Sequence, residues 1–490
     1  MSNSILLDDG SNIDSFLEKS VSDIIEEITK DYNSSEFSIR VQPENDTLLS
    51  YSVQHHQSTF QYLQYLAATQ GEYLVYSRDT LHFGKPDLGD EIPLNYGVDL
   101  KDFSLGLTVN PLHFNYYSND YTSESTIETS SNSIASSASG YSAFANNVSK
   151  QFFHKKDNKQ IFYGFESQQL QQQLDSSVAL QKKLAEQKQV SIVGKSTNTG
   201  VSLGKIIVIK SNQGDFGRYR VIQIKHSYKQ GGTYTNNFTA IPLEIDVYPL
   251  TDIDLMHPSH PQVAKVIAVN DPNGMSRIKA QFPWQKMYNK TTPWIRVATP
   301  YAGGDRGFHL LPEENDEVLI GFENGDVERP YMQSALYTGV NKHNAWQSEN
   351  NDFKGLTTKG GHVIELNDTK GGEMITITDK NGNKILIDTA NNNMEISALE
   401  NMTLSAKNIK ISASENIEVS AGKDMTNSVG ENLNMMAKNK NIVVDKNLMV
   451  STEKQEMVSE EITLSSNSKN LTLASGKIVD IQSTEKVKLY

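Results

Sequence analysis

A short apolar motif recurs at intervals of about eight residues through the last quarter of the chain. Each copy is a pair of apolar residues separated by one residue. Residues i and i+2 of a strand point to the same face, so each copy predicts a short strand with two inward side chains. The predicted core pairs are Met394/Ile396, Met402/Leu404, Ile409/Ile411, Ile417/Val419, Leu471/Leu473, Val479/Ile481 and Val487/Leu489.

Eight residues are too few for one chain to complete a solenoid turn around a core, but three chains can each supply one side of a triangular prism. The repeat therefore predicts a homotrimer with an intertwined triple-stranded β-helix over residues 364–490, in which each repeat adds ~4.8 Å. The alternative is a flat stack of exposed strands, which would aggregate through its open edges. The repeat is imperfect, because Asn427 follows Met425 in an inward position and the spacing varies from six to nine residues over 440–464.

The composition argues against several classes of protein. The formal net charge is −14, whereas nucleic-acid binders need a basic surface stripe. No run of about 18 apolar residues is present, so no membrane span is expected. The first ten residues show no signal-peptide pattern. With no cysteine in the chain, neither disulfides nor thiol chemistry is expected.

The first ninety residues have a mixed α and β pattern. Capping-box signals at Ser20 and Ser58 predict two helices, and Gly71 predicts the end of the second one. Residues 73–83 then predict two short strands.

The middle of the chain continues this mixed pattern. Ten serines between residues 121 and 150 predict a surface loop or linker. Residues 165–189 predict an amphipathic helix, and residues 192–247 predict strands. We assign residues 1–257 to one region of α+β structure.

Pro258 and Pro261 mark a boundary, after which Gly, Pro and Asn break the sequence into short strands. This pattern, with a turn at Asp271–Gly274, is typical of a small Greek-key barrel. We assign residues 258–340 to the barrel and 341–363 to a neck linker. The predicted strands of the barrel include residues 263–269, 277–282, 294–298 and 317–322.

Several stretches resemble VgrG, the spike of type VI secretion, and the related hub-spike proteins of contractile phage tails. They follow the order of that family along nearly the whole chain, which is more specific than any one motif. The matching stretches are Ile5–Gly10, Ser15–Ser20, Tyr51–Gln54, Phe60–Gly71, Asp271–Gly274, Arg277–Trp284, Trp294–Ala298, Leu311–Phe322, Gly325–Asp326, Arg329–Pro330, Leu336–Gly339, Gly361–Asp368 and Gly371–Gly372.

The resemblance implies a mainly β, trimeric spike with an α+β hub on the tube, an OB-fold barrel at the neck and a membrane-piercing β-helix. It implies a hub that lacks the family's first barrel portion. It also implies an Hcp-like tube protein, baseplate proteins, secreted effectors and a PAAR-like tip cap as partners. The cap would bind the last repeat, at Val487, Leu489 and Tyr490. Such a protein is assembled in the bacterial cytoplasm and then injected into target cells.

Residue clusters that could carry chemistry have simpler interpretations. The carboxylates Glu313, Glu314, Asp316 and Glu317 precede a strand and are interpreted as solvated or turn-forming, although paired carboxylates serve glycosidases. The histidine pairs His55/His56 and His257/His260 lack the further ligands that zinc requires. We expect no catalytic residue, metal or cofactor.

Two glycine-containing turns superficially resemble binding loops. Asp379–Asn383 begins like a calcium loop, but Lys384 and Ala390 occupy positions that require Gly and Glu. An Asn-Gly hairpin turn between Ile377 and Ile385 explains it better. Gly303–Gly307 lacks the ending of a phosphate loop and predicts a barrel turn.

Three alternatives to a type VI spike remain. A spike with an inserted lysozyme is nearly excluded, because a hydrolytic domain needs on the order of 100 residues and few separate Gly339 from Leu366. A trimeric fibre or adhesin would use the same β-helix as a stalk. Extracellular contractile particles and phage tails use related spikes, and the sequence leaves that choice open.

Overall fold

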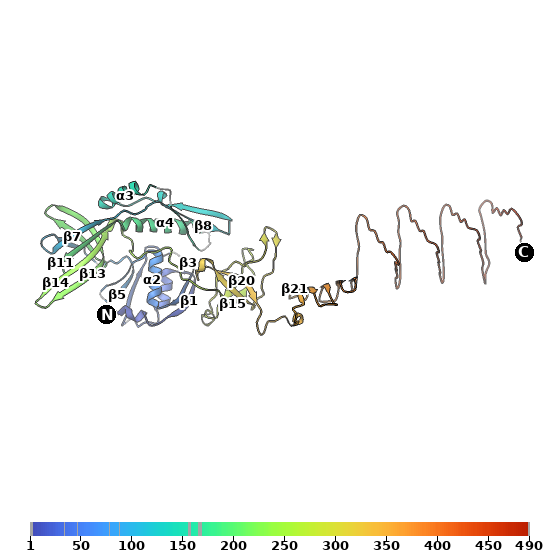
Figure 1. Cartoon of the computed structure of the whole chain (residues 1–490), viewed down its shortest axis with the longest axis horizontal. Coiled ribbons are helices and arrows are strands. Elements are labelled where there is room, and N and C mark those ends of the chain that lie inside the picture. Colours follow the sequence, from blue (N-terminus) through green and yellow to red (C-terminus); the bar gives the residue numbers. More distant parts are fainter. Residues whose placement is uncertain are drawn as a thin grey trace. The chain divides into compact units, whose positions relative to one another are not determined.

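The computed structural model describes residues 3–33, 35–46, 48–77, 79–87, 89–154, 158–164 and 169–488. The chain divides into two compact units, Met1–Leu399 and Glu400–Tyr490. All assigned helices and strands belong to the first unit, which is mainly β (Figure 1). Of the helices described, none is long and apolar enough to cross a membrane.

The chain begins with a small α/β layer. Two helices, α1 (Val21–Thr29) and α2 (Thr59–Gln70), pack beside an antiparallel pair, β1 (Asn12–Ser20) with β3 (Leu48–Gln57). A second sheet has the order β2-β5-β4, from β2 (Ser38–Gln42), β4 (Leu74–Ser77) and β5 (Thr80–Gly84).

Local capping sets the ends of both helices. The backbone N–H of Asp23 donates to the Ser20 side chain, and Ser58 and Gln61 form a reciprocal capping box. Gly71 ends α2 in the left-handed conformation at φ 70°, which glycine adopts without a Cβ penalty. The predictions for both helices and for the strands of residues 73–83 are confirmed.

A six-stranded sheet follows, with the order β6-β12-β13-β14-β11-β7. Its edge strands β6 and β7 are consecutive in the chain, and a bridge between Tyr96 and Leu100 links them. Inward side chains such as Ile192, Ile207 and Phe238 form the core. The predicted strands of 192–247 are confirmed; the sheet consists of β6 (Ile92–Asn95), β7 (Leu100–Leu107), β11 (Val190–Ser196), β12 (Ile206–Ser211), β13 (Gly214–Lys229) and β14 (Thr233–Pro242).

An insertion lies between β7 and β11, which pair directly with each other. Its long helix α4 buries Leu170, Leu174, Val178 and Leu184, as predicted. The insertion contains β8 (Phe114–Asp120), β9 (Ser125–Ser130), α3 (Gly140–Phe152), β10 (Asn158–Ile161) and α4 (Leu170–Gln187).

The prediction of a loop over residues 121–150 is wrong for most of that stretch, which forms β9 and α3. Serine usually disfavours a helix because its hydroxyl competes for the backbone. Here the small side chains of α3 face the protein and bind other partners instead: the Ser142 hydroxyl donates to Glu244, and Asn146 donates to Glu186.

The next part is a four-stranded antiparallel sheet with the order β16-β15-β19-β20. At its first turn the backbone N–H of Gly274 donates to the carbonyl of Asp271, as predicted. The core includes Tyr51 and Val53 of β3, so the α/β layer and this sheet share one core. The strands are β15 (Gln262–Ala268), β16 (Lys279–Gln281), β19 (Glu317–Phe322) and β20 (Pro330–Leu336). Residues 294–298 make only isolated bridges, at Ile295 and Val297, where a strand was predicted.

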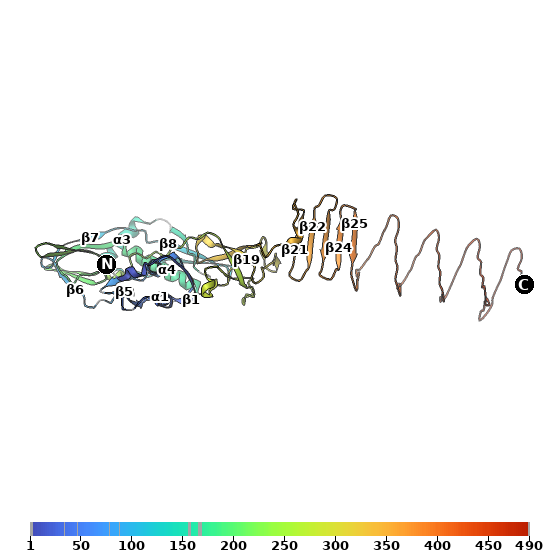
Figure 2. The same cartoon turned by 90° about the horizontal axis from the view of Figure 1, so that it is seen from below.

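The first unit ends in a five-stranded antiparallel meander, in which each strand pairs with the next one along the chain (Figure 2). The first strand already lies within the residues assigned to the neck. The strands are β21 (Phe353–Thr357), β22 (Val363–Asn367), β23 (Met374–Thr378), β24 (Lys384–Asp388) and β25 (Asn393–Ser397).

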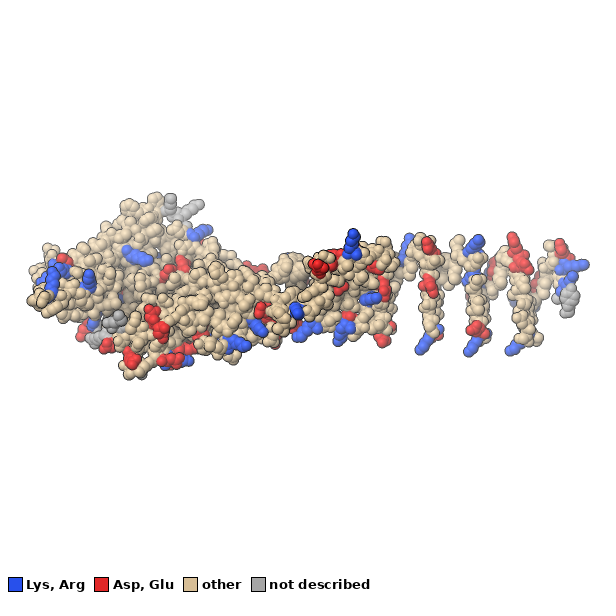
Figure 3. Space-filling model, turned by 60° about the horizontal axis from the view of Figure 1, so that its bottom comes forward, with Lys and Arg blue, Asp and Glu red and all other residues tan. Residues whose placement is uncertain are grey.

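The second unit has a different character. Between residues 400 and 488, the described part of this unit, no helix or strand is assigned and every side chain is exposed. Both lysine and acidic side chains occur along it (Figure 3). The segment therefore has neither a core nor a backbone ladder of its own.

Candidate functional site

One face of the meander is apolar and uncovered. Cross-strand pairing aligns its side chains in two columns, which run Leu356–Ile364–Ile377–Ile385–Ile396 and Leu366–Ile375–Ile387–Met394. These nine side chains, which we call the apolar face, are between 37% and 64% exposed. Contiguous exposed apolar surface of this kind marks an interaction site.

The opposite face of the meander is largely polar, with Phe353, Val363, Met374 and Leu386 as its apolar members. Lys384 pairs with Glu395 at 3.0 Å, and the indole N–H of Trp346 donates to Glu365 at 2.7 Å. Trp346 lies against Gly355 in β21, where an added Cβ would be 2.6 Å from the indole ring. The two faces therefore differ sharply, and the apolar one is available to a partner.

The predicted core pairs extend the same pattern into the second unit. Met394 and Ile396 lie in β25 on the apolar face, and Leu489 and Tyr490 lie outside the described residues. The other predicted pair members are between 48% and 72% exposed. The structure brings none of these side chains into an in-chain core; they are Met402, Leu404, Ile409, Ile411, Ile417, Val419, Leu471, Leu473, Val479, Ile481 and Val487.

The residue clusters considered for chemistry make local contacts. The carboxylate of Asp316 accepts a hydrogen bond from the backbone N–H of Glu313 at 2.8 Å, and Glu313 pairs with Lys359 at 3.0 Å. Turn-forming carboxylates are the interpretation that this geometry supports. His55 contacts His56, whereas His257 lies on the ring of Tyr65, with centroids 4.1 Å apart. Within the described ranges, no group of three or more His, Asp or Glu side chains could hold a metal ion.

Both glycine-containing loops are turns. The Asp379 carboxylate accepts hydrogen bonds from the backbone N–H groups of Asn381, Gly382 and Asn383, which close the β23–β24 hairpin. Gly303 and Gly307 lie in a short hairpin whose strands have two residues each, β17 (Ala302–Gly303) and β18 (Arg306–Gly307). The predictions of a hairpin turn and a barrel turn are confirmed.

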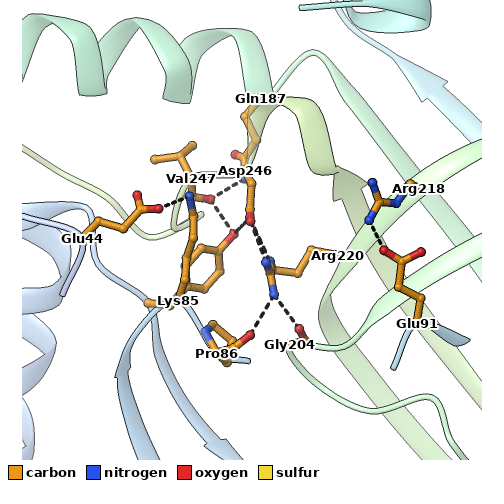
Figure 4. A network of polar contacts seen from close by, with 11 residues as sticks. Glu44, Lys85, Pro86, Glu91, Gln187, Gly204, Arg218, Arg220, Asp246 and Val247 are labelled. Carbon is orange, nitrogen blue, oxygen red and sulfur yellow. Dashed lines mark hydrogen bonds and ion pairs between the residues drawn. The ribbon is translucent and has the colours of Figure 1, made fainter. Parts of the chain in front are cut away.

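A buried ion pair, which the sequence did not reveal, joins the six-stranded sheet to the α/β layer (Figure 4). Arg220 of β13 binds the Asp246 carboxylate through Nε at 2.9 Å and Nη2 at 2.7 Å. The Tyr73 hydroxyl donates to the same carboxylate at 2.6 Å, and Arg220 Nη1 donates to the carbonyl of Gly204 at 2.8 Å. Burial, and then the charge of Asp246, raise the pKa of Tyr73.

A second polar cluster joins the α/β layer to the four-stranded sheet. The carboxylate of Glu328 accepts hydrogen bonds from Ser52, from the backbone of Val53 and from the Tyr65 hydroxyl, at 2.7, 2.8 and 3.0 Å. Enclosure by the protein, and then the charge of Asp326, raise the pKa of Glu328 to about 7. No local pattern marks this residue, because its partners lie far away in the sequence.

A cavity of about 790 Å³ borders this cluster. Glu328, Asp326, Asp254 and Gln172 are among its lining residues. The lining is mixed, because apolar side chains such as Leu66, Ile253 and Met256 lie among these amides and carboxylates. The cavity can therefore contact both polar and apolar groups.

Comparisons with known proteins agree with this architecture. Residues 262–337 match the family model described as the type VI secretion system/phage-baseplate injector OB domain. The four-stranded sheet is thus an OB-fold barrel.

Curated relatives match over parts of the chain. The chain is 31% identical over 134 residues to the type VI secretion system spike protein VgrG5 of Pseudomonas aeruginosa, covering 25% of this chain and 16% of that protein. It is 29% identical over 145 residues to the actin cross-linking toxin VgrG1 of Vibrio cholerae, covering 25% of this chain and 13% of that protein. These matches span less than a fifth of either relative.

A solved structure extends the likeness in fold. A chain of the Francisella PdpA–VgrG complex aligns with a TM-score of 0.50 and 10% identity, covering 80% of this chain and 64% of that chain. The resemblance to VgrG-type spike and hub proteins, expected from the motifs, is confirmed.

Proposed function

We propose that this chain, a relative of the VgrG-type spike proteins, is one subunit of a homotrimeric spike of a contractile injection machine. The observation that carries the proposal is the state of residues 400–488. They hold an apolar pair at about every eighth position, yet they form no core and no ladder within the described chain. Buried backbone N–H and C=O groups require partners, and three intertwined chains supply them.

The apolar face supports the same assembly. Its two columns of side chains run across five strands and end at Ile396 and Met394, the first predicted core pair. Three such faces turned toward a common axis would remove this surface from water, at about 25 cal/mol for each Å² buried. The apolar pairs of the second unit then continue that core.

The proposed mechanism is mechanical. Residues 1–257 dock on the tube, the OB barrel of 258–340 forms the neck with 341–363, and residues 364–490 form the shaft. Contraction of the sheath drives the shaft through a target membrane. A closed prism suits this task, because shear must break many ladder hydrogen bonds together and no sheet edge is left to peel. We assign the chain no enzymatic role.

The proposed partners follow from the resemblance. They are an Hcp-like tube protein, baseplate proteins, secreted effectors and a PAAR-like cap at the last repeat. The spike would be assembled in the bacterial cytoplasm and delivered into target cells. Detection of an epitope-tagged chain inside target cells, dependent on a working sheath, tests this route.

A second candidate function is the spike of an extracellular contractile particle or a phage tail. This second candidate is supported by the description of the matching OB family, which names phage baseplates beside type VI secretion. A trimeric fibre or adhesin is a weaker candidate. The neighbouring genes distinguish the three.

Light scattering on the purified full chain tests the trimer. We expect three times the mass of a 54.6 kDa chain. Hydrogen exchange should show protected amides between residues 400 and 488. A folded monomer with strand-rich circular dichroism would overturn the proposal.

A further inference from the structure

Two neighbouring repeats of the second unit depart from the rest. In most repeats the residue between the two core positions is polar, as in Thr403, Glu418 and Asp480. In the repeats Ile442–Val444 and Leu448–Val450, that middle residue is Val443 or Met449. Side chains alternate between the two faces of a strand, so three consecutive apolar residues place at least one outside the core in either register.

The structure separates the two classes by exposure. Val443 is 90% exposed, whereas Ile442 and Val444 beside it are 58% and 47% exposed. Met449 is 86% exposed, between neighbours at 66% and 63%. Met436 and Val458 are also nearly fully exposed, at 98% and 87%. We call Met436, Val443, Met449 and Val458 the outer apolar set.

In a closed trimer the outer apolar set would form a band. Its four members belong to successive repeats. Because each repeat advances the shaft by one strand spacing of ~4.8 Å, the four lie within roughly 15–20 Å along the shaft. The three-fold axis repeats them on every side. Isolated apolar side chains on a surface are ordinary, but a contiguous band marks an interaction site.

Charged residues of opposite sign occur in two blocks along the band. Lys438, Lys440 and Lys446 occur from Met436 to Met449, with Asp445 as the one acidic residue among them. The acidic residues Glu453, Glu456, Glu460 and Glu461 occur on either side of Val458, accompanied by Lys454. Lys454 pairs with Glu456 at 2.9 Å, which leaves the acidic excess on this side.

We propose that the outer apolar set is the docking site of a partner protein whose own apolar surface is flanked by acidic side chains toward the lysines and basic side chains toward the glutamates. The proposal rests on the proposed trimeric shaft. Opposite charges toward the two ends of the apolar band fix the direction in which a protein partner docks. An anionic membrane fits less well, because it attracts clusters of basic residues and the glutamates would repel it.

The experiment uses full-length trimers immobilised for a binding measurement. The analytes are the proteins encoded by the genes beside this one, each purified, and phosphatidylglycerol vesicles. The double variant Val443→Thr and Met449→Gln removes the apolar side chains and keeps the core positions. Glu418→Gln changes an outward residue of another repeat and serves as the matched control.

We expect one purified protein to bind the native trimer and the Glu418→Gln trimer equally. We expect its affinity to fall at least tenfold for the double variant, and to fall also for Lys438→Glu with Lys440→Glu. All variants should keep the native trimer mass and melting temperature.

The proposal is overturned if no such protein binds, or if it binds the double variant as tightly as the native trimer. It is also overturned if vesicles bind the native trimer but not the double variant. A drop in melting temperature of the double variant would place these residues in the core and would overturn it too. A monomer in the mass measurement would instead refute the proposed trimeric function, which keeps the two failures distinct.

Discussion

The backbone N–H of Val53 donates a 2.8 Å hydrogen bond to the carboxylate of Glu328, 275 residues further along the chain. Ser52 and Tyr65 donate to the same carboxylate. The contact joins β3 and α2 to the loop before β20, and so couples the α/β layer to the OB barrel. The titratable groups that interact with Glu328 include Asp326, Tyr51, Tyr62 and Tyr65.

Glu328 should make stability depend on pH. Its folded-state pKa of about 7 lies above the ordinary value of 4.5, so the folded chain favours the protonated acid. The resulting stabilisation is complete below pH 4.5 and is lost as pH rises through 7. We expect the free energy of unfolding to fall by about 3 kcal/mol from this group alone between these limits.

The variant Glu328→Gln keeps an oxygen for Ser52 and Val53 and removes the charge. We expect a flatter pH dependence of the urea midpoint, followed by the fluorescence of Trp284 and Trp294, which lie within the residues of the barrel. If the urea midpoint changes with pH by the same amount in the native chain and in Glu328→Gln, Glu328 does not titrate in this range.

Asp271 should stabilise the barrel through Arg277. The carboxylate accepts hydrogen bonds from Nε and Nη2 of Arg277 at 2.9 Å each, and the two side chains are 2% and 10% exposed. We expect Asp271→Asn to cost about 3 kcal/mol, because it leaves the Arg277 charge buried without a counterion. The control Asp368→Asn breaks the exposed pair with Lys354 and should cost under about 1 kcal/mol.

The cost of Asp271→Asn should also depend on pH. Arg277 lowers the pKa of Asp271 from 3.8 to about 2. The stabilisation from the carboxylate is therefore present above 3.8 and is lost as pH falls through 2. The melting temperatures of the native chain and of Asp271→Asn should converge in acid. If their difference stays constant down to pH 2, the Asp271–Arg277 ion pair is not the source of that difference.

Leu404 should be buried in the trimer, and its neighbour Thr403 should face solvent. Leu404→Asp places three carboxylates in one layer of the shaft, and each unpaired buried charge costs several kcal/mol. We expect a lower melting temperature and dissociation at micromolar concentration, measured by circular dichroism and light scattering. Thr403→Asp is the matched control and should keep the trimer. Equal behaviour of the two variants would contradict the assigned faces.

Gly355 should tolerate no side chain. A Cβ there would lie 2.1 Å from the carbonyl oxygen of Ile364 and 2.6 Å from the indole of Trp346. Gly355→Ala should displace Trp346 from the polar face of the meander and redshift its fluorescence, with a cost of about 1–3 kcal/mol. In Gly372→Ala the nearest atom is 3.7 Å away, so that variant should resemble the native chain.

The features predicted correctly from the sequence are those set by nearby residues. Ser20 and Ser58 cap helices through atoms three residues away, and Gly71 ends α2 by its own conformation. The α3 helix was missed because its serines and Asn146 bind partners from distant segments, which a composition rule cannot reveal. Glu328 and the Arg220–Asp246 pair were missed for the same reason.

The predicted core pairs show a different limit. Their two-residue alternation and eight-residue spacing are readable because they are local. The surfaces that would cover them belong to other copies of the chain, so their burial remains a prediction. The apolar face of the meander was hidden by its variable turns, which break the regular spacing before Met394.

The meander also determines when each part of the chain can acquire its structure. Its five strands pair in sequence order within one chain, so they can form on a single nascent polypeptide. Residues 400–488 have no such option and, in the proposed trimer, wait for two other copies. Only the first encounter then depends on protein concentration; winding proceeds afterwards in one direction, toward the C-terminus. Synthesis follows the same direction, so residues 400–488, which are the most exposed to misassociation, leave the ribosome after the meander.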